Sequence, residues 1–223
     1  MSRQKNKTKT LKQTMFAAAS ASLGSAGCVS LAFALPGGGA IVSGGITIGV
    51  SGSNMTITQA NSKGIINWGV VGGTEGAPGA SGFNINAGEL VNFVQNAGSS
   101  SVTLNRDLSG ALSNISGMLT ANGNVFLVNP AGVVFGGGAQ VNVGGLLATT
   151  ANIADSDFLG TDGTSKFAFS GSHAGEITTA LGSSISAGQG GTATAVADTG
   201  AYVYLIAPTV TTNGDIETHV VSQ

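Results

Sequence analysis

Few residues in this chain of 223 are able to do chemistry. Its two histidines, His173 and His219, have no carboxylate or histidine neighbours at the spacing of a metal site or a catalytic pair. We therefore expect both to be surface residues. The acidic cluster of Asp155, Asp157 and Asp162 alternates as calcium ligands can, but it lacks the glycine and the further oxygen ligands of an EF-hand loop. We expect a solvated turn there.

Beyond position 34 the chain has three basic residues, Lys63, Arg106 and Lys166. Enzymes that cleave polysaccharides need paired carboxylates, or a base, facing one groove. None of the three lies near the acidic cluster in the sequence, and there is no G-x-S-x-G elbow and no phosphate-binding Gly-Lys-Ser/Thr loop. The sequence therefore predicts no catalysis, no cofactor and no metal, and a β-helical carbohydrate-active enzyme stays only as an alternative.

Charge is distributed unevenly along the chain. Five of the eight basic residues lie in the first twelve positions, and all ten acidic residues follow position 34. Without residues 1–34 the net charge is −7, which excludes a nucleic-acid binder because such proteins need a basic surface. The 37 glycines argue against a helical bundle, since each glycine in a helix costs about 1 kcal/mol.

The N-terminus has the three-part pattern of a secretory signal peptide. A basic leader precedes an apolar segment of small residues, and Ala32 and Ala34 occupy the −3 and −1 positions of a cleavage site. We predict a signal peptide over residues 1–34, export by the general secretion machinery, and an exported domain over residues 35–223. A membrane anchor is the alternative, because twenty residues can just span a bilayer.

We expect signal peptidase to cleave between Ala34 and Leu35, because the apolar run ends there with small residues correctly spaced. N-terminal sequencing or the intact mass of the exported protein should show Leu35 first. A retained leader, or a lipid on Cys28, would contradict this prediction. Cleavage also removes the single cysteine, so the exported chain has neither a disulfide nor a thiolate metal site.

Short stretches of alternating apolar and polar residues recur between clusters of turn residues, as at 46–50, 55–57 and 141–143. This pattern predicts an all-β fold: a sandwich, a barrel or a β-solenoid. An internal echo favours the solenoid, because residues 125–130 (VFLVNP) return as residues 203–208 (VYLIAP). At about 20 residues per coil we expect about nine coils. A β-sandwich stays as the alternative.

The order of several motifs resembles one family. The segments that carry the resemblance are 83–85, 89–95, 103–106, 115–117 and 122–136. They resemble the N-terminal secretion domain of two-partner secretion exoproteins, the filamentous haemagglutinins and high-molecular-weight adhesins of Gram-negative bacteria. The resemblance runs from about residue 40 to residue 215. It implies a right-handed parallel β-helix (β-solenoid) with an N-terminal cap of antiparallel strands.

The family's Asn-Pro-Asn-Gly signature appears here as Asn129-Pro130-Ala131-Gly132, with Ala131 in place of the second Asn. Asn-Pro-x-Gly suits a type I turn, in which the first Asn side chain bonds the backbone two residues on. We expect this turn, either as a simple corner between coils or also as part of the surface that a transporter reads. The second family signature, Asn-Pro-Asn-Leu, has no match, and residues 95–98 (QNAG) lie near its expected place.

The resemblance implies recognition for export. After reaching the periplasm, the domain would be bound, extended or partly folded, by the periplasmic recognition domains of an outer-membrane β-barrel transporter and delivered to the cell surface or the medium. The implied recognition motif is the Asn129 turn, with a supporting set of Asn105, Arg106, Asn122 and Gly123. An adhesin would then meet a host-cell glycan or protein. A cytolysin or contact-dependent toxin is the alternative within the family.

Overall fold

The regular structure of the described residues is twenty-one strands and one short helix. The computed structural model describes residues 35–77, 81–160, 168–171, 174–188 and 201–219, all within the unit Phe33–Gln223. The predicted signal peptide, residues 1–34, lies outside them. In the described ranges, no helix is long and apolar enough to cross a membrane. The predominance of strands, with one helix of five residues among the described residues, confirms the all-β prediction.

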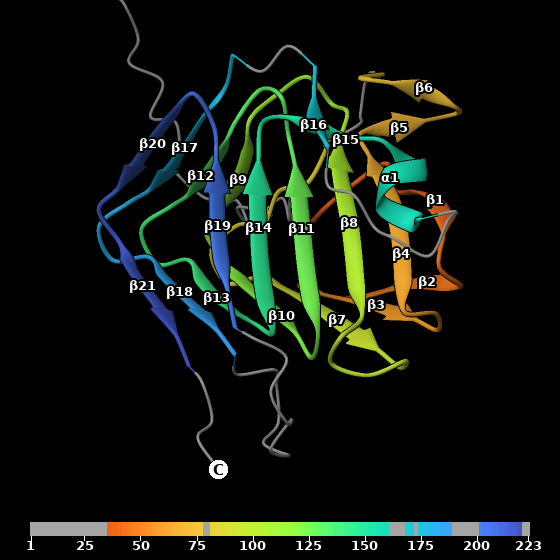
Figure 1. Cartoon of the computed structure of the whole chain (residues 1–223), viewed down its shortest axis with the longest axis horizontal. Helices are drawn as coiled ribbons and strands as arrows, with labels where there is room; N and C mark the ends of the chain where they lie inside the picture. Colours follow the sequence, from red (N-terminus) through yellow and green to blue (C-terminus); the bar gives the residue numbers. More distant parts are fainter. Residues whose placement is uncertain (1–34, 78–80, 161–167, 172–173, 189–200, 220–223) are drawn as a thin grey trace, which may run out of the picture. The chain divides into compact units, whose positions relative to one another are not determined.

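Most of the strands belong to three sheets (Figure 1). The first sheet contains, in spatial order, β1 (Ala40–Ser43), β4 (Lys63–Trp68), β8 (Val102–Asp107), β11 (Asn124–Val128), β14 (Gly145–Thr149) and β19 (Val203–Ile206). The second contains β2 (Ile46–Ser51), β3 (Asn54–Gln59), β7 (Leu90–Gln95), β10 (Met118–Ala121), β13 (Gln140–Val143), β18 (Ser184–Ala187) and β21 (Asp215–Thr218). The third contains β20 (Thr209–Thr212), β17 (Glu176–Thr179), β12 (Val133–Phe135) and β9 (Ser113–Ile115).

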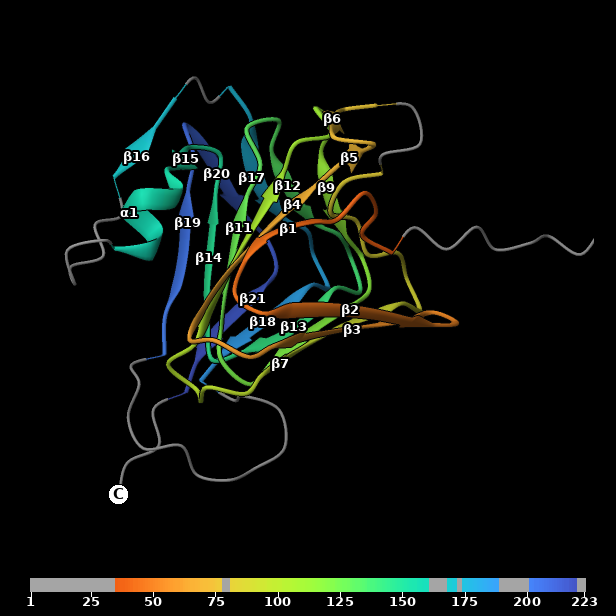
Figure 2. The ribbon, with the colours of Figure 1, turned by 90° about the vertical axis from the view of Figure 1, so that its right-hand side faces the viewer.

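The chain passes through these sheets in a fixed order. It runs from the second sheet to the first, then to the third, and back to the second, as in β7-β8-β9 followed by β10-β11-β12. Strands of successive coils pair in parallel, so Val91 lies beside Leu119 and Leu119 beside Val141. The three sheets therefore stack coil upon coil around one interior, which Figure 2 views along the stack.

The coils are longer and fewer than the expected nine. Successive residues at one register position of the second sheet are separated by 36, 28, 22, 44 and 31 residues: Met55, Val91, Leu119, Val141, Ile185 and Ile216. The estimate of about 20 residues per coil was therefore too short. The excess lies in segments between the sheet strands, which include the small pairs β5 (Val70–Val71) with β6 (Thr74–Glu75) and β15 (Asn152–Ile153) with β16 (Phe169–Ser170).

The internal echo of the sequence corresponds to stacked positions. Val125 pairs with Leu146, which pairs in turn with Val203, so the two similar segments lie two coils apart on the first sheet. Their inward side chains belong to the main core, in which each fully buried large aliphatic or aromatic side chain contributes about 1.5–3 kcal/mol. The interpretation of the echo as repeated coils is confirmed.

Antiparallel strands close the N-terminal end of the stack. In the first sheet β1 pairs antiparallel with β4, and in the second β2 pairs antiparallel with β3. All the other pairings within the three large sheets are parallel. The added antiparallel strands cover the edges of the first coil, which would otherwise present unpaired backbone groups.

Candidate functional site

Residues 129–132, which we call the NPAG turn, connect the first sheet to the third between β11 and β12. The Gly132 amide donates to the Asn129 carbonyl at 3.0 Å, which closes a four-residue turn. The Ala131 amide donates to Asn129 Oδ1 at 2.9 Å. The predicted turn and its side-chain bond are therefore confirmed, and Ala131 is tolerated because its position uses only the backbone amide.

The Asn129 side chain is inside the domain. Only 1% of Asn129 is exposed, and its Nδ2 donates to the Ala111 carbonyl at 2.8 Å and to Ser113 Oγ at 2.9 Å. Pro130 is exposed and Ala131 is half-buried. The folded surface at this corner therefore consists of Pro130 and Ala131, and the amide of Asn129 is not part of it.

Gly132 is the position of the turn that requires glycine. Its φ is +116°, and a Cβ there would lie 2.7 Å from the carbonyl oxygen of Glu176 in the next coil. The amide of Gly175 donates to the Pro130 carbonyl at 3.1 Å. The next coil thus packs directly on the turn and leaves no room for a side chain at position 132.

Asn122 and Gly123 lie at the opposite end of β11 from the NPAG turn. Asn122 Oδ1 accepts from the Gln95 amide at 2.7 Å, and its Nδ2 donates to the Gln95 carbonyl at 3.1 Å, so the side chain pairs with the backbone of the preceding coil. A Cβ on Gly123 would lie 2.4 Å from Gln95 Oε1. The predicted site residues are thus divided between two ends of one strand.

A row of buried side-chain hydrogen bonds lies at that end of β11. Thr103 Oγ1 donates to Gln59 Oε1 at 2.5 Å, and Gln95 Nε2 donates to Thr103 Oγ1 at 3.0 Å. Sequence reasoning did not include Gln59 or Thr103 in the site. The available signal was that Gln59 and Gln95 each end a strand of alternating apolar residues, and the two are paired in register.

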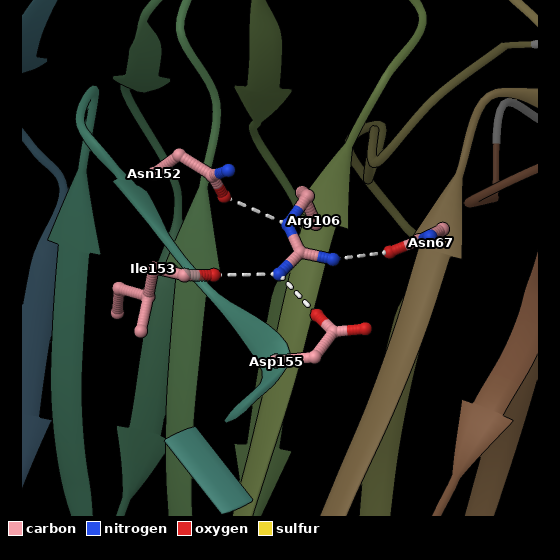
Figure 3. A network of polar contacts seen from close by, with 5 residues as sticks. All are labelled: Asn67, Arg106, Asn152, Ile153 and Asp155. Carbon is pink, nitrogen blue, oxygen red and sulfur yellow. Dashed lines mark hydrogen bonds and ion pairs between the residues drawn. The ribbon is translucent and has the colours of Figure 1, made fainter. Parts of the chain in front are cut away.

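Asn105 and Arg106 point to opposite faces of the first sheet. Asn105 is fully buried inside the coils, where its Oδ1 accepts from Trp68 Nε1 at 3.0 Å. Arg106 lies on the outer face, and its bonds are drawn in Figure 3. Its guanidinium donates to Asn67 Oδ1, Asn152 Oδ1, the Ile153 carbonyl and Asp155 Oδ1, at 2.7–2.9 Å. Neither side chain is free to contact a partner in the folded domain.

We expected a solvated turn at the acidic cluster, and at Asp155 and Asp157 this prediction is wrong because both lie on a short helix. Asp155 begins α1 (Asp155–Leu159), and its carboxylate forms an ion pair with Arg106 at 2.7 Å. Because the Asp155 side chain is 43% exposed, the ion pair itself contributes little. The hydrogen bonds of Arg106 to Asn152 and Ile153 attach the residues just before α1 to β8 as well.

Residues 151–160, which we call the arm, lie against the outer face of the first sheet (Figure 2). Phe158 of α1 is buried there with Leu104 and Phe126, and its ring meets that of Phe126 edge-to-face at 6.0 Å. Lys63 Nζ donates to the Phe158 and Leu159 carbonyls at 2.8 Å each, at the C-terminal end of the helix. The arm is therefore attached at both ends to strands of earlier coils.

His219 is a partly exposed residue, with Nε2 3.3 Å from Glu217 Oε2, so its predicted place on the surface is confirmed. His173, Asp162, Lys166 and the predicted cleavage residue Ala34 lie outside the described residues. In the part of the chain that the structure describes, no group of three or more His, Cys, Asp or Glu side chains is placed to hold a metal ion.

Comparison with known families identifies the domain that these coils form. The TPS secretion domain family matches residues 80–221, which contain every strand from β7 to β21 and the NPAG turn. The chain belongs to the TPS secretion domain family. TPS domains are the secretion domains of exoproteins that are exported across the outer membrane by two-partner systems. The resemblance seen in the sequence is confirmed.

Individual relatives of this TPS domain come from Haemophilus influenzae. Two proteins named heme/hemopexin-binding protein are 38% identical over 119 residues and 40% identical over 99 residues, which are 53% and 44% of this chain. The matched parts are 12% and 9% of those relatives, so the chain covers about a tenth of their length. The crystal structure of the HMW1 secretion domain is similar with a TM-score of 0.63 and 28% identity, covering 82% of this chain and 42% of that one.

Proposed function

We propose that this TPS domain is the export signal that the periplasmic domains of an outer-membrane transporter recognise. In this proposal the domain, residues 35–223, reaches the periplasm after signal peptidase removes residues 1–34. It then crosses the outer membrane and completes a right-handed β-helix outside the cell. The observation that supports the proposal is the family match over residues 80–221, which spans the coils on both sides of the NPAG turn.

The transporter recognises the NPAG turn before the coils close. Asn129 is 1% exposed in the folded domain, so a partner gains access to its amide only while the chain is extended or partly folded. The same amide then ties the finished turn to Ala111 and Ser113. Recognition and folding therefore compete for one side chain, and folding outside the cell releases the chain from its partner.

The supporting residues act by completing the fold. Asn105 bonds inside the coils, Arg106 holds the arm, and Asn122 with Gly123 fixes the start of β11. Folding on the far side of the membrane helps to drive export when it is strongly favourable, so these residues contribute to the secreted yield. The low charge of the domain suits this route, because few ionised side chains have to be desolvated when the coils stack.

The complete exoprotein is proposed to be non-enzymatic. An adhesin delivered to the cell surface, with a host glycan or protein as its target, is the first candidate. The names of the two relatives favour a second, heme or hemopexin binding. We assign neither activity to the TPS domain itself, since the parts of those proteins that match this chain are 12% and 9% of their length.

Dependence of secretion on the transporter tests the proposal. The full chain should be expressed with and without a two-partner transporter, and its amount measured in the medium, at the cell surface and in the periplasm. We expect the protein outside the cell only when the transporter is present, and in the periplasm when it is absent. Equal amounts outside the cell in both strains would contradict the proposed function.

A further inference from the structure

A buried carboxylate lies directly beneath the NPAG turn. Asp107 is the last residue of β8 and is 1% exposed. No ion pair to it is found among the described residues, where the ion pairs are Arg106–Asp155 and His219–Glu217. A buried carboxylate loses its hydration, which costs free energy. Without a cation beside it, this cost has to be offset by hydrogen bonds.

Four donors from three successive coils converge on this carboxylate. Asp107 Oδ2 accepts from the Phe83 amide at 2.8 Å and from Ser113 Oγ at 2.7 Å, and Oδ1 accepts from the Ser109 amide at 2.9 Å. Asn129 Nδ2 lies 3.4 Å from Oδ2 and 2.9 Å from Ser113 Oγ. Asp107 is thus connected to the NPAG turn chiefly through the Ser113 hydroxyl, which donates to Asp107 and accepts from Asn129.

The backbone around Asp107 is shaped to admit it. Gly82 has a φ of +68°, and a Cβ there would lie 2.5 Å from Asp107 Oδ1. The chain before Phe83 therefore approaches the carboxylate at a distance that only glycine permits. Hydrogen bonds to a charged acceptor are stronger than those to a neutral one, so the carboxylate holds its donors more firmly than an amide would.

We infer that Asp107 is the positioning residue of the NPAG turn, and that export requires it because, by fixing Asn129 through Ser113, it favours the folded turn that releases the chain from its partner. This inference rests on the proposed function. Asp107 does not contact the transporter in this scheme. It acts on Asn129, so its loss should loosen the turn locally while the sheets of the second and third coils remain intact.

Hydrogen exchange and secretion, measured on the same variants of the full chain, test the inference. In Asp107→Ala we expect the Ala131 and Gly132 amides to exchange about tenfold faster, while amides of β7 and β10 change by less than about twofold. Secretion should fall together with this protection. Asp107→Asn keeps an acceptor facing Phe83 and Ser113 but turns an NH2 group toward the Ser109 amide, so it should restore part of both. Asp215→Ala, at an exposed position of β21, is the matched control.

Two results would overturn the inference, and they are distinguishable. Unchanged exchange at Ala131 and Gly132 in Asp107→Ala would show that Asp107 does not position the turn. Faster exchange with normal secretion would show that Asp107 positions the turn but that export does not depend on it, while recognition of the unfolded turn by the transporter would still stand. If Asp107→Ala does not fold, Ser113→Ala removes only the bridging hydroxyl and is judged by the same two measurements.

Discussion

Phe158→Ala should lower the free energy of unfolding by about 3–5 kcal/mol, the cost typical of removing a buried phenylalanine ring. The ring fills the space between the arm and the outer face of the first sheet, where Leu104 and Phe126 are also buried. Without it the arm keeps Arg106 and Lys63 as attachments but loses its apolar contact. Urea denaturation followed by circular dichroism measures the change.

Phe169→Ala is the matched control for this prediction. Phe169 lies on β16 and is 38% exposed, so its truncation should cost less than about 1 kcal/mol. Equal losses of unfolding free energy in the two variants would show that Phe158 does not stabilise the contact between the arm and the first sheet.

Gly132→Ala should destabilise the domain by roughly 3 kcal/mol or more, because it combines an unfavourable backbone conformation with a steric clash. The φ of +116° is strained for alanine, and the new Cβ would lie 2.7 Å from the Glu176 carbonyl oxygen. The next coil can relieve the clash only by moving away from the turn. We expect a lower melting temperature and a smaller secreted fraction.

Gly98→Ala separates the two contributions. Gly98 has a similar φ of +108°, but nothing lies within 4 Å of the position of its Cβ. It should therefore show the conformational cost alone, about 1–3 kcal/mol. If Gly132→Ala is no worse than Gly98→Ala, the close packing of the coils on the NPAG turn is not important for stability.

The short strands and the NPAG turn were predictable because their signals are local. The alternation of side chains marks the strands, and Asn-Pro-x-Gly specifies its own turn chemistry. The echo of residues 125–130 at 203–208 was informative because stacked coils repeat similar side chains at the same register position.

Strand β8 shows why the interior of the site could not be predicted. Alternation suggests that Leu104 faces the core and that its polar neighbours face water. In the structure Leu104 faces outward beneath the arm, whereas Thr103 and Asn105 pair with the core residues Val125 and Leu127 and point inward. Because the arm covers the outer face of the first sheet, apolar side chains there are buried although they point away from the core. The local sequence of β8 carries no sign of this cover.

The arm was missed for a related reason. Arg106 and Asp155 are 49 residues apart, and their contact depends on an insertion between β14 and β17 that has no periodicity of its own. The same insertion lengthens one coil to 44 residues, and the other coils, at 22 to 36 residues, also exceed the assumed length of about 20, so the estimate gave too many coils.

The secreted fraction of Asn129→Ala, compared with that of an equally destabilised variant, tests the central claim most directly. Gln59→Ala is the matched variant, because Gln59 is also a fully buried amide with several hydrogen bonds but lies outside the matched residues 80–221. Each substitution should cost about 2–4 kcal/mol, since it leaves buried partners unsatisfied. Asn213→Ala, at an exposed turn, gives the baseline for a harmless change.

If the transporter recognises Asn129, secretion of Asn129→Ala should fall about tenfold below that of Gln59→Ala, the effect of losing about 1.4 kcal/mol of binding. Ala131→Asn, which restores the family's signature at a half-buried position, should be secreted at least as well as the natural chain. Equal secretion of Asn129→Ala and Gln59→Ala at equal stability would contradict the account and leave Asn129 as a structural residue alone.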